Sequence, residues 1–473
     1  MRLLLLLAVF SLSLKPVMAQ RAAAPPAFDT RLHDIAAAPS AARIAADVRK
    51  LVSFGTRHTL SDTLSTTRGI GAARRWIRAE FERISQACGG CLEVYEQRVT
   101  IDSAGNRRID VPTELVNVYA VLRGTKRPND YVIMSGDIDS RISDPMDRTG
   151  DSPGANDNAS GMAGVLEAAR VLSAYRFENS VLLAGLSGEE QGLFGGKAMA
   201  EMAKLRGWNI IGVLNNDMIG NYHGIDGVVD NRTFRIFSEP NFQSADERLR
   251  IWRRFYGGEV DGASRQLARY VHRITEQYLP QLNPMMIYRL DRFGRGGHHR
   301  PFNDAGFAGV RIMEAHEHYD RQHQDIRTEG GRAYGDVLSG VDFDYAARLT
   351  AVNACVLASL GWAPPAPEVV ELGGSVAPAA FLRWRGDEQA DILGYKLYYR
   401  LTTEPQWTDY VWVPGSVDEH TMTGLVVDNY FFGVAAVGRT GHESLVVFPG
   451  VVLRSSAPTS GRSGGQPTPT PPR

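Results

Sequence analysis

The sequence predicts an α/β protein: a mainly parallel, mixed and twisted sheet with helices on both faces, followed by a small all-β sandwich. Two observations support this fold class. Between residues 112 and 362, apolar strand-like segments alternate with helical segments, as in sheets built from strand–helix–strand units. After residue 364, short segments of alternating apolar and polar residues follow one another with turns between them, which is typical of a sandwich.

Residues 1–20, MRLLLLLAVFSLSLKPVMAQ, have the composition of an export signal. Arg2 precedes an apolar run, and small residues lead to a cleavage position after Ala19. The run is too short to be a stable membrane anchor, and no other segment of the sequence has transmembrane length. We therefore expect residues 1–19 to be a signal peptide and the protein to be secreted or periplasmic, without a membrane anchor.

Cysteine usage and charge limit the class of protein. Cys88 and Cys91, in CGGC, suit a small-loop disulfide in an oxidising compartment, with a redox motif as the alternative. Cys355 lies in an apolar stretch and is expected to be a buried free thiol. The formal net charge of -1, from 52 basic and 53 acidic residues, predicts no nucleic-acid partner. A small partner is expected instead, and the oligomeric state is left open.

The predicted elements follow in chain order. Two helical regions, within residues 22–51 and 61–84, precede the first strand. Strand-like segments at residues 115–124, 131–137, 180–188 and 210–220 then alternate with helical segments at residues 161–175 and 192–207. In such sheets, ligands bind where the strands end and the loops begin.

Residues 221–295 interrupt this alternation with a polar stretch that contains one clear helix, at residues 264–279. We expect an insertion there that leaves the sheet as a lid or rim. The pattern resumes with GVRIMEA at residues 309–315, and a helix at residues 343–361 closes an α/β domain that spans residues 20–363.

A linker, APPAPE, leads into the second domain, residues 364–455. Trp384 and the apolar strand at residues 430–437 resemble the core of a fibronectin type III module. Residues 456–473 are polar and rich in proline, a composition that predicts disorder.

Acidic residues cluster at the ends of several predicted strands, and histidines follow another. Buried carboxylates this close together need cations to neutralise them, which predicts a metal site. A lone acidic residue at a strand end is often only a helix cap. The adjacent pair Glu189 and Glu190 is more specific, because one can bind a metal while the other remains a base. The cluster consists of Asp137, Asp139, Asp157, Glu189, Glu190, Asp217, His316, His318 and His323.

In this order, the motifs GDIDS, GANDNASG, SGEEQGLFG and LNNDMIGN resemble those of the exported co-catalytic di-zinc exopeptidases. This family includes bacterial leucyl aminopeptidases, glutamate carboxypeptidase and glutaminyl cyclase. The resemblance covers residues 112–362 and implies a metallo-exopeptidase that binds two divalent ions, zinc with manganese as the alternative, and acts on peptides.

The resemblance also implies a role for each matching residue. Asp157 would bridge the two ions. Glu190 and a late histidine would complete the ligands of one ion, and Asp137 and Asp217 those of the other. Glu189 matches the general base, and Asp139 matches a carboxylate that supports the ligand two residues before it.

Two positions depart from the family pattern. Asp137 stands where the family has a histidine, so four carboxylates cancel the charge of two divalent ions and harder ions such as Mn²⁺ compete better with zinc. Arg321 stands where the late histidine is usual. We expect His323 to replace it, with His318 and then His316 as alternatives. His299 resembles a position that faces the substrate, with a structural histidine as the alternative.

The sequence thus predicts an exported aminopeptidase that hydrolyses N-terminal residues from peptides, with Glu189 activating the attacking water. A carboxypeptidase or a glutaminyl cyclase would use much the same ligands, and a cationic group facing the substrate's end would favour the carboxypeptidase. Arg292 and Arg295 could bind a substrate carboxylate, although surface positions are expected for them. A non-catalytic binding protein with a degenerate metal site is the remaining alternative.

Overall fold

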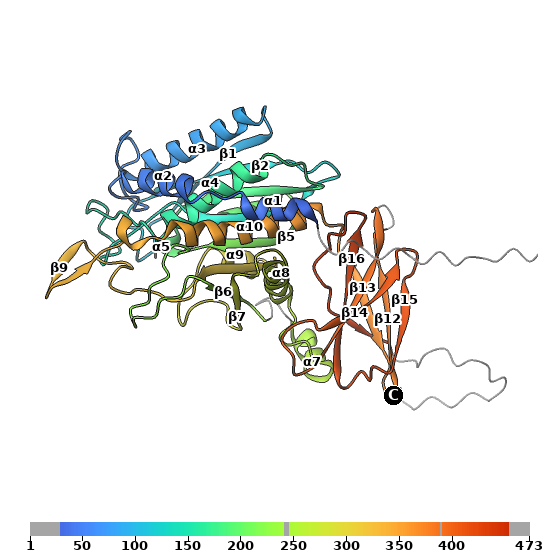
Figure 1. Ribbon diagram of the computed structural model, residues 1–473. Coiled ribbons are helices and arrows are strands. Elements are labelled where there is room, and N and C mark those ends of the chain that lie inside the picture. The colour runs from blue at the N-terminus through green and yellow to red at the C-terminus, as the bar shows by residue number, and fades with distance from the viewer. Residues whose placement is uncertain (1–28, 241–245, 388–389, 454–473) are drawn as a thin grey trace, which may run out of the picture.

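The computed structural model describes residues 29–240, 246–387 and 390–453, which form an α/β body and a β-sandwich (Figure 1). The predicted signal peptide at residues 1–19 and the polar tail at residues 456–473 lie outside the described residues. No helix in the described part of the chain has the length and apolar character needed to cross a membrane.

An eight-stranded mixed sheet forms the centre of the α/β body, in the order β1-β2-β4-β3-β5-β8-β6-β7. β3 runs parallel to β4 and β5, and β5 runs parallel to β8. β1, β2 and β6 add antiparallel pairs. The predicted fold class is confirmed. The strands are β1 (Leu92–Ile101), β2 (Thr113–Leu122), β3 (Arg127–Asp137), β4 (Asn179–Leu186), β5 (Asn209–Asn216), β6 (Thr233–Ser238), β7 (Asn283–Ile287) and β8 (Gly309–Glu314).

Helices cover both faces of this sheet because its central strands are apolar on both sides. In β4, Val181 and Leu183 pack into the larger core, whereas Leu182 and Ala184 pack into the smaller one. The larger core is shared with α1 (Thr30–Ala37), α2 (Ala41–Val52), α3 (Gly69–Ala87), α4 (Ala159–Leu172), α8 (Ala263–Tyr278) and α10 (Phe343–Trp362). The smaller core is shared with α6 (Phe194–Leu205) and α9 (His299–Asp304).

The expectation that residues 221–295 leave the sheet is wrong. β6 pairs with β8 and β7 pairs with β6, so this region extends the sheet. Both strands are short, and Arg235 and Pro284 interrupt their apolar pattern, which is why the sequence did not reveal them. The region also contains α7 (Glu247–Tyr256) and the predicted helix, α8. A hairpin of β9 (Arg327–Glu329) and β10 (Arg332–Tyr334) projects from the body (Figure 1).

Both predictions about the cysteines are confirmed. Cys88 and Cys91 form a disulfide, and Cys355 is a buried free thiol in α10.

Two sheets form the C-terminal sandwich, in the orders β15-β12-β11-β17 and β14-β13-β16. The predicted small β-sandwich is confirmed, and Trp384 is buried in its core against Tyr395. Its likeness to fibronectin type III stays a prediction. The strands are β11 (Val369–Gly373), β12 (Ala379–Arg385), β13 (Ile392–Leu401), β14 (Asp409–Pro414), β15 (Glu419–Thr423), β16 (Tyr430–Gly438) and β17 (Val451–Val452).

Buried ion pairs join the sandwich to the α/β body. Asp261, before α8, accepts hydrogen bonds from Arg269 of α8 at 2.7 Å and from Arg400 of β13 at 2.8 Å. Glu443 of the sandwich pairs with Arg273 of α8 at 2.9 Å. Because breaking a buried pair leaves an uncompensated charge, these contacts hold the two parts in one arrangement.

Candidate metal centre and active site

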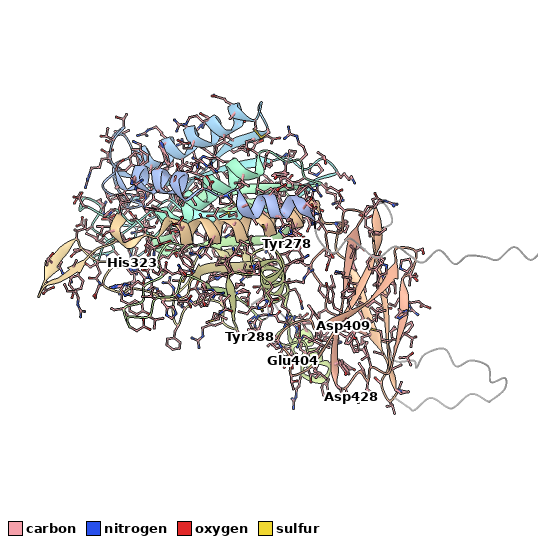
Figure 2. All side chains as sticks on the ribbon, viewed as in Figure 1. Tyr278, Tyr288, His323, Glu404, Asp409 and Asp428 are labelled. Carbon is pink, nitrogen blue, oxygen red and sulfur yellow. A yellow bond between two sulfur atoms is a disulfide. The ribbon has the colours of Figure 1, made fainter. Side chains whose placement is uncertain are left out.

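The predicted site residues gather at one edge of the sheet. Asp137 ends β3, Glu189 follows β4, and Asp217 follows β5. These three strands are parallel neighbours, so their carboxyl ends meet at the same edge. Figure 2 shows His323 at the end of the α/β body that lies away from the sandwich.

Asp157, Glu190 and His323 form a group that can hold a metal ion. One donor atom from each lies within 4.8 Å of the others. His323 Nε2 is 3.0 Å from Asp157 Oδ2 and 2.9 Å from Glu190 Oε1. One imidazole nitrogen and two carboxylate oxygens are ligands that Zn²⁺ accepts, and a catalytic zinc keeps its fourth position open. The donor set therefore fits zinc.

Charge couples the members of this group. Burial alone would lower the pKa of His323, but the charge of Glu190 and the hydrogen bond to Asp157 raise it to about 9. Burial opposes ionisation of Asp157, yet the hydrogen bond from His323 holds the pKa of Asp157 below its ordinary value. The imidazole of His323 and the two adjacent carboxylates thus stabilise one another's charged forms.

A buried carboxylate fixes the loop that carries Asp157. Asp336 accepts hydrogen bonds from the backbone N–H groups of Asn156 at 2.8 Å and Asp157 at 2.7 Å. The fully buried Arg57 donates to the carbonyls of Pro153 and Gly154 in the same loop. Neither residue was predicted as part of the site, because neither lies in a motif at a strand end.

Asp139 supports Glu189 and Glu190 and does not support Asp137. Its carboxylate accepts hydrogen bonds from the backbone N–H groups of Glu189 at 3.2 Å and Glu190 at 3.0 Å, where the short helix α5 (Glu189–Gly192) begins. Thr59 donates to the same carboxylate at 2.9 Å. The prediction that Asp139 supports Asp137 is therefore wrong, because the hydrogen bonds of Asp139 go to the residues that follow β4.

Glu189 lies beside this group without belonging to it. Burial, and then the charge of Glu190, raise the pKa of Glu189 well above its ordinary value. A carboxyl group whose pKa is moved toward neutral pH can both take up and release a proton.

Asp137 and Asp217 contact protein groups of positive or polar character. Asp137 Oδ1 lies 2.6 Å from His298 Nδ1, and Asn158 donates to its other oxygen at 2.6 Å. Asp217 Oδ2 lies 2.9 Å from Nη2 of Arg311. Burial raises the pKa of both carboxyl groups above the ordinary value, and the charge of Arg311 opposes this rise.

The other predicted histidines lie elsewhere. His299 is fully buried, and its Nε2 is 2.8 Å from the carbonyl of Leu290, so the structural alternative holds and the expected substrate contact is corrected. Its neighbour His298 contacts Asp137 instead. His316 Nε2 is 4.0 Å from Asp230, and the ring of His318 packs against His223. Neither joins Asp157 and Glu190.

A cavity of about 540 Å³ opens onto the site. Asp157, Glu189, Glu190, Asp217 and His323 all line it, so the metal-binding group and the candidate base share one space. Within the part of the chain that the structure describes, no residue of the sandwich lines this cavity.

Known proteins resemble this chain over most of its length. Residues 117–337 match peptidase family M28. A probable zinc metalloprotease of Leptosphaeria maculans is 42% identical over 416 residues, which cover 87% of this chain and 94% of the relative. Another, from Pyricularia oryzae, is 39% identical over 419 residues, which cover 86% of this chain and 82% of the relative.

Solved structures share the fold at lower identity. LapB from Legionella pneumophila has a TM-score of 0.51 and 17% identity, covering 70% of this chain and 75% of its own. The LapA aminopeptidase of the same organism has a TM-score of 0.51 and 15% identity, covering 72% and 78%. The family match, the close relatives and the zinc-compatible donors together show that this chain belongs to the zinc metalloproteases of peptidase family M28.

Proposed function

We propose that the protein is an exopeptidase that removes terminal residues from peptides, with Glu189 as general base. The observation that carries this proposal is the shared cavity, in which Glu189 stands beside Asp157, Glu190 and His323 without being one of the three donors. A base that does not bind the metal keeps a lone pair free for the proton of the attacking water.

Each residue then has a distinct task. Asp157, Glu190 and His323 would hold the zinc ion, which would supply Lewis acidity toward the scissile carbonyl and the attacking water. Glu189 accepts the proton of that water and passes it to the leaving amine. Asp139 fixes the backbone of Glu189 and Glu190, so the base and its neighbouring ligand keep one relative position.

We propose that one zinc ion is sufficient here, in contrast to the two expected from the sequence. Asp137 and Asp217, which the resemblance assigns to a second ion, already contact His298 and Arg311. Among the described residues, one group of three brings its donor atoms within 4.8 Å of one another, namely Asp157, Glu190 and His323. The donors for one ion are therefore assembled, whereas a second ion would have to compete with Arg311 for Asp217.

Aminopeptidase activity is our first candidate. Carboxylates that are not bound to metal, such as Asp217, can receive the free α-amine of a substrate at the cavity wall. The shared fold of the LapA aminopeptidase agrees with this candidate. A carboxypeptidase is the second candidate, favoured by the cationic side chains that line the same cavity.

Export and the identity of the sandwich complete the proposal. Residues 1–19 have the pattern of a signal peptide, and the Cys88–Cys91 disulfide suits an oxidising compartment. The seven strands in two sheets, with a buried Trp384, support a fibronectin type III-like module that spaces or stabilises the enzyme.

Metal analysis and peptide hydrolysis test the function together. We expect the purified protein to contain about one zinc per chain. Glu189→Gln should keep that zinc while lowering peptide hydrolysis by about 100-fold or more. Release of amino acids from free but not from N-acetylated peptides would identify an aminopeptidase. Release from both, lost when the C-terminus is amidated, would identify a carboxypeptidase. Two zinc ions per chain would contradict the single-ion proposal, and undiminished turnover by Glu189→Gln would remove it as the base.

Formation of pyroglutamate from an N-terminal glutamine, without hydrolysis, would show a cyclase instead. Zinc-loaded protein that alters no peptide would support the non-catalytic alternative.

A further inference from the structure

Cationic side chains line much of the cavity beside the metal-binding group. Six of its lining residues are cationic, from five separate segments of the chain: Arg108, Arg141, Lys197, Arg292, Arg295 and Arg300. Besides Asp157, Glu189, Glu190 and Asp217, the acidic lining residue is Asp304, and it already lies 3.7 Å from Arg300.

Three of these cations have no acidic partner among the residues that the structure describes: Arg108, Lys197 and Arg295. Arg108 comes from the loop between β1 and β2, and its Nη1 donates to the carbonyl of Glu190 at 2.5 Å. Lys197 lies on α6 with Nζ 5.1 Å from the ring of Phe194, and Arg295 lies in the loop before α9. All three side chains are exposed at the cavity.

The remaining cations are already paired. Arg141 contacts Glu190, and Arg292 donates to Glu317 at 2.9 Å. Paired cations are offset by their partners, whereas Arg108, Lys197 and Arg295 present an uncompensated charge to whatever enters. In a cleft with low-dielectric walls, charge of one sign concentrates ligands of the opposite sign.

We infer that this cavity selects peptides that carry a carboxylate on the residue next to the scissile bond, bound by Arg108, Lys197 and Arg295. The inference rests on the proposed exopeptidase function and assigns its substrate class. Arginine and lysine bind carboxylates through charge-assisted hydrogen bonds, and arginine can do so with two bonds at once. Such a carboxylate has two sources, the side chain of a terminal acidic residue or the free C-terminus of the peptide.

A matched peptide series separates these sources. The peptides are Glu-Ala-Ala-Trp and Gln-Ala-Ala-Trp with a free N-terminus, and N-acetyl-Trp-Ala-Ala with a free or an amidated C-terminus. If the carboxylate is the acidic side chain, kcat/KM should be at least about tenfold higher for the Glu peptide than for the Gln peptide. If it is the C-terminus, the free acid should exceed the amide by at least about tenfold. Ratios below about twofold in both pairs would overturn the inference.

Three substitutions test the residues themselves. Arg108→Gln, Lys197→Gln and Arg295→Gln should each raise KM for the preferred anionic peptide by about threefold to tenfold while leaving kcat nearly unchanged. Lys204→Gln is the matched control, because Lys204 is exposed on the same helix as Lys197 but does not line the cavity. Equal effects of Lys204→Gln and Lys197→Gln, or no effect of any of the three, would contradict the inference.

A binding measurement keeps the two proposals distinguishable. We expect the zinc-loaded protein to bind N-acetyl-glutamate more tightly than N-acetyl-glutaminamide, which lacks both carboxylates, in calorimetry, and Arg295→Gln to reduce this difference. Hydrolysis without a preference for anionic peptides would overturn the specificity and leave the exopeptidase intact. Selective anion binding without hydrolysis would retain the anion site and overturn the exopeptidase. If the protein neither hydrolyses peptides nor binds anions selectively, the exopeptidase function and the specificity are both overturned.

Discussion

Arg311 donates a hydrogen bond from Nη2 to Asp217 Oδ2 across 2.9 Å, and neither side chain is exposed by more than 4%. The same guanidinium pairs with Asp291 at 3.1 Å, so it is fixed from two sides. Asp217 is a carboxylate that the family pattern assigns to a second metal ion. The positively charged side chain of Arg311 therefore lies next to Asp217, the carboxylate expected to bind a second ion.

Replacement of this cation should change the metal content. Arg311→Gln removes the positive charge beside Asp217, so we expect zinc in the purified protein to rise from about one toward about two per chain. Elemental analysis after dialysis against zinc measures this. Arg235→Gln is the control, because Arg235 pairs with Glu317 outside the metal-binding group. A metal content unchanged by Arg311→Gln would show that Arg311 does not limit the number of ions.

Removal of the imidazole should abolish tight metal binding. His323→Ala deletes the nitrogen donor of the three-residue group, and we expect the zinc affinity to fall by more than about 100-fold, beyond the effect of losing an outer hydrogen-bond partner. Competition with a zinc chelator gives the affinity. His318→Ala should retain wild-type affinity. Loss of zinc affinity in His318→Ala but not in His323→Ala would make His318 the ligand.

The loop carboxylate Asp336 should affect both stability and metal binding. Asp336→Ala leaves the buried N–H groups of Asn156 and Asp157 without an acceptor, which costs about 1–3 kcal/mol for each unsatisfied group. We also expect the zinc affinity to fall by about 10–100-fold, because Asp157 is held less firmly. Denaturant unfolding and chelator competition measure the two effects. Asp325→Ala, which removes a contact with Ser143 at the surface, serves as control.

Glu314 should make stability depend on pH. It is 1% exposed, and burial raises its pKa from 4.5 to about 8, although hydrogen bonds from Asn156 and Asn221 oppose the rise. Between these two pH values the folded state holds a proton that the unfolded state has released. The free energy of unfolding therefore falls as the pH rises through this interval, by up to about 5 kcal/mol from this group.

Glu314→Gln keeps an oxygen acceptor and cannot ionise, so its stability should fall less between pH 5 and pH 8. The difference in unfolding free energy between the two proteins isolates this group from other titrations. Parallel curves for the wild type and Glu314→Gln would show that Glu314 does not titrate there.

The ion pairs between sandwich and α/β body should matter for stability and not for catalysis. Asp261→Asn leaves the buried Arg269 and Arg400 without their shared carboxylate, and we expect a loss of about 3–5 kcal/mol. Thermal unfolding measures the loss. Peptide hydrolysis well below the unfolding temperature should be unchanged, because the cavity is lined by the α/β body alone among the described residues. A large drop in kcat would show that the sandwich reaches the site.

The sequence located the acidic residues of the site because each follows an apolar strand, and the ends of neighbouring parallel strands meet at one edge. It could not reveal Arg311, which lies inside an apolar strand and reaches Asp217 only because β5 and β8 are neighbours. It also pointed to His299, whereas its neighbour His298 is the histidine that contacts Asp137. Successive residues of a helix differ by about 100° in direction, so only the packing of α9 decides which ring contacts Asp137.

The strands of residues 221–295 were missed for a related reason. β6 is stabilised by its pairing with β8, far away in the sequence, rather than by a strong local pattern. The central strands β3, β4 and β5 were found because burial on both faces makes them continuously apolar.

Asp139 accepts one hydrogen bond from each of two successive peptide groups, those of Glu189 and Glu190. Both the candidate base, Glu189, and the adjacent metal ligand, Glu190, are therefore held by one carboxylate. A displacement of Asp139 would move the two residues together. Single substitutions can therefore change the cavity wall one residue at a time, whereas the positions of Glu189 and Glu190 can only change together.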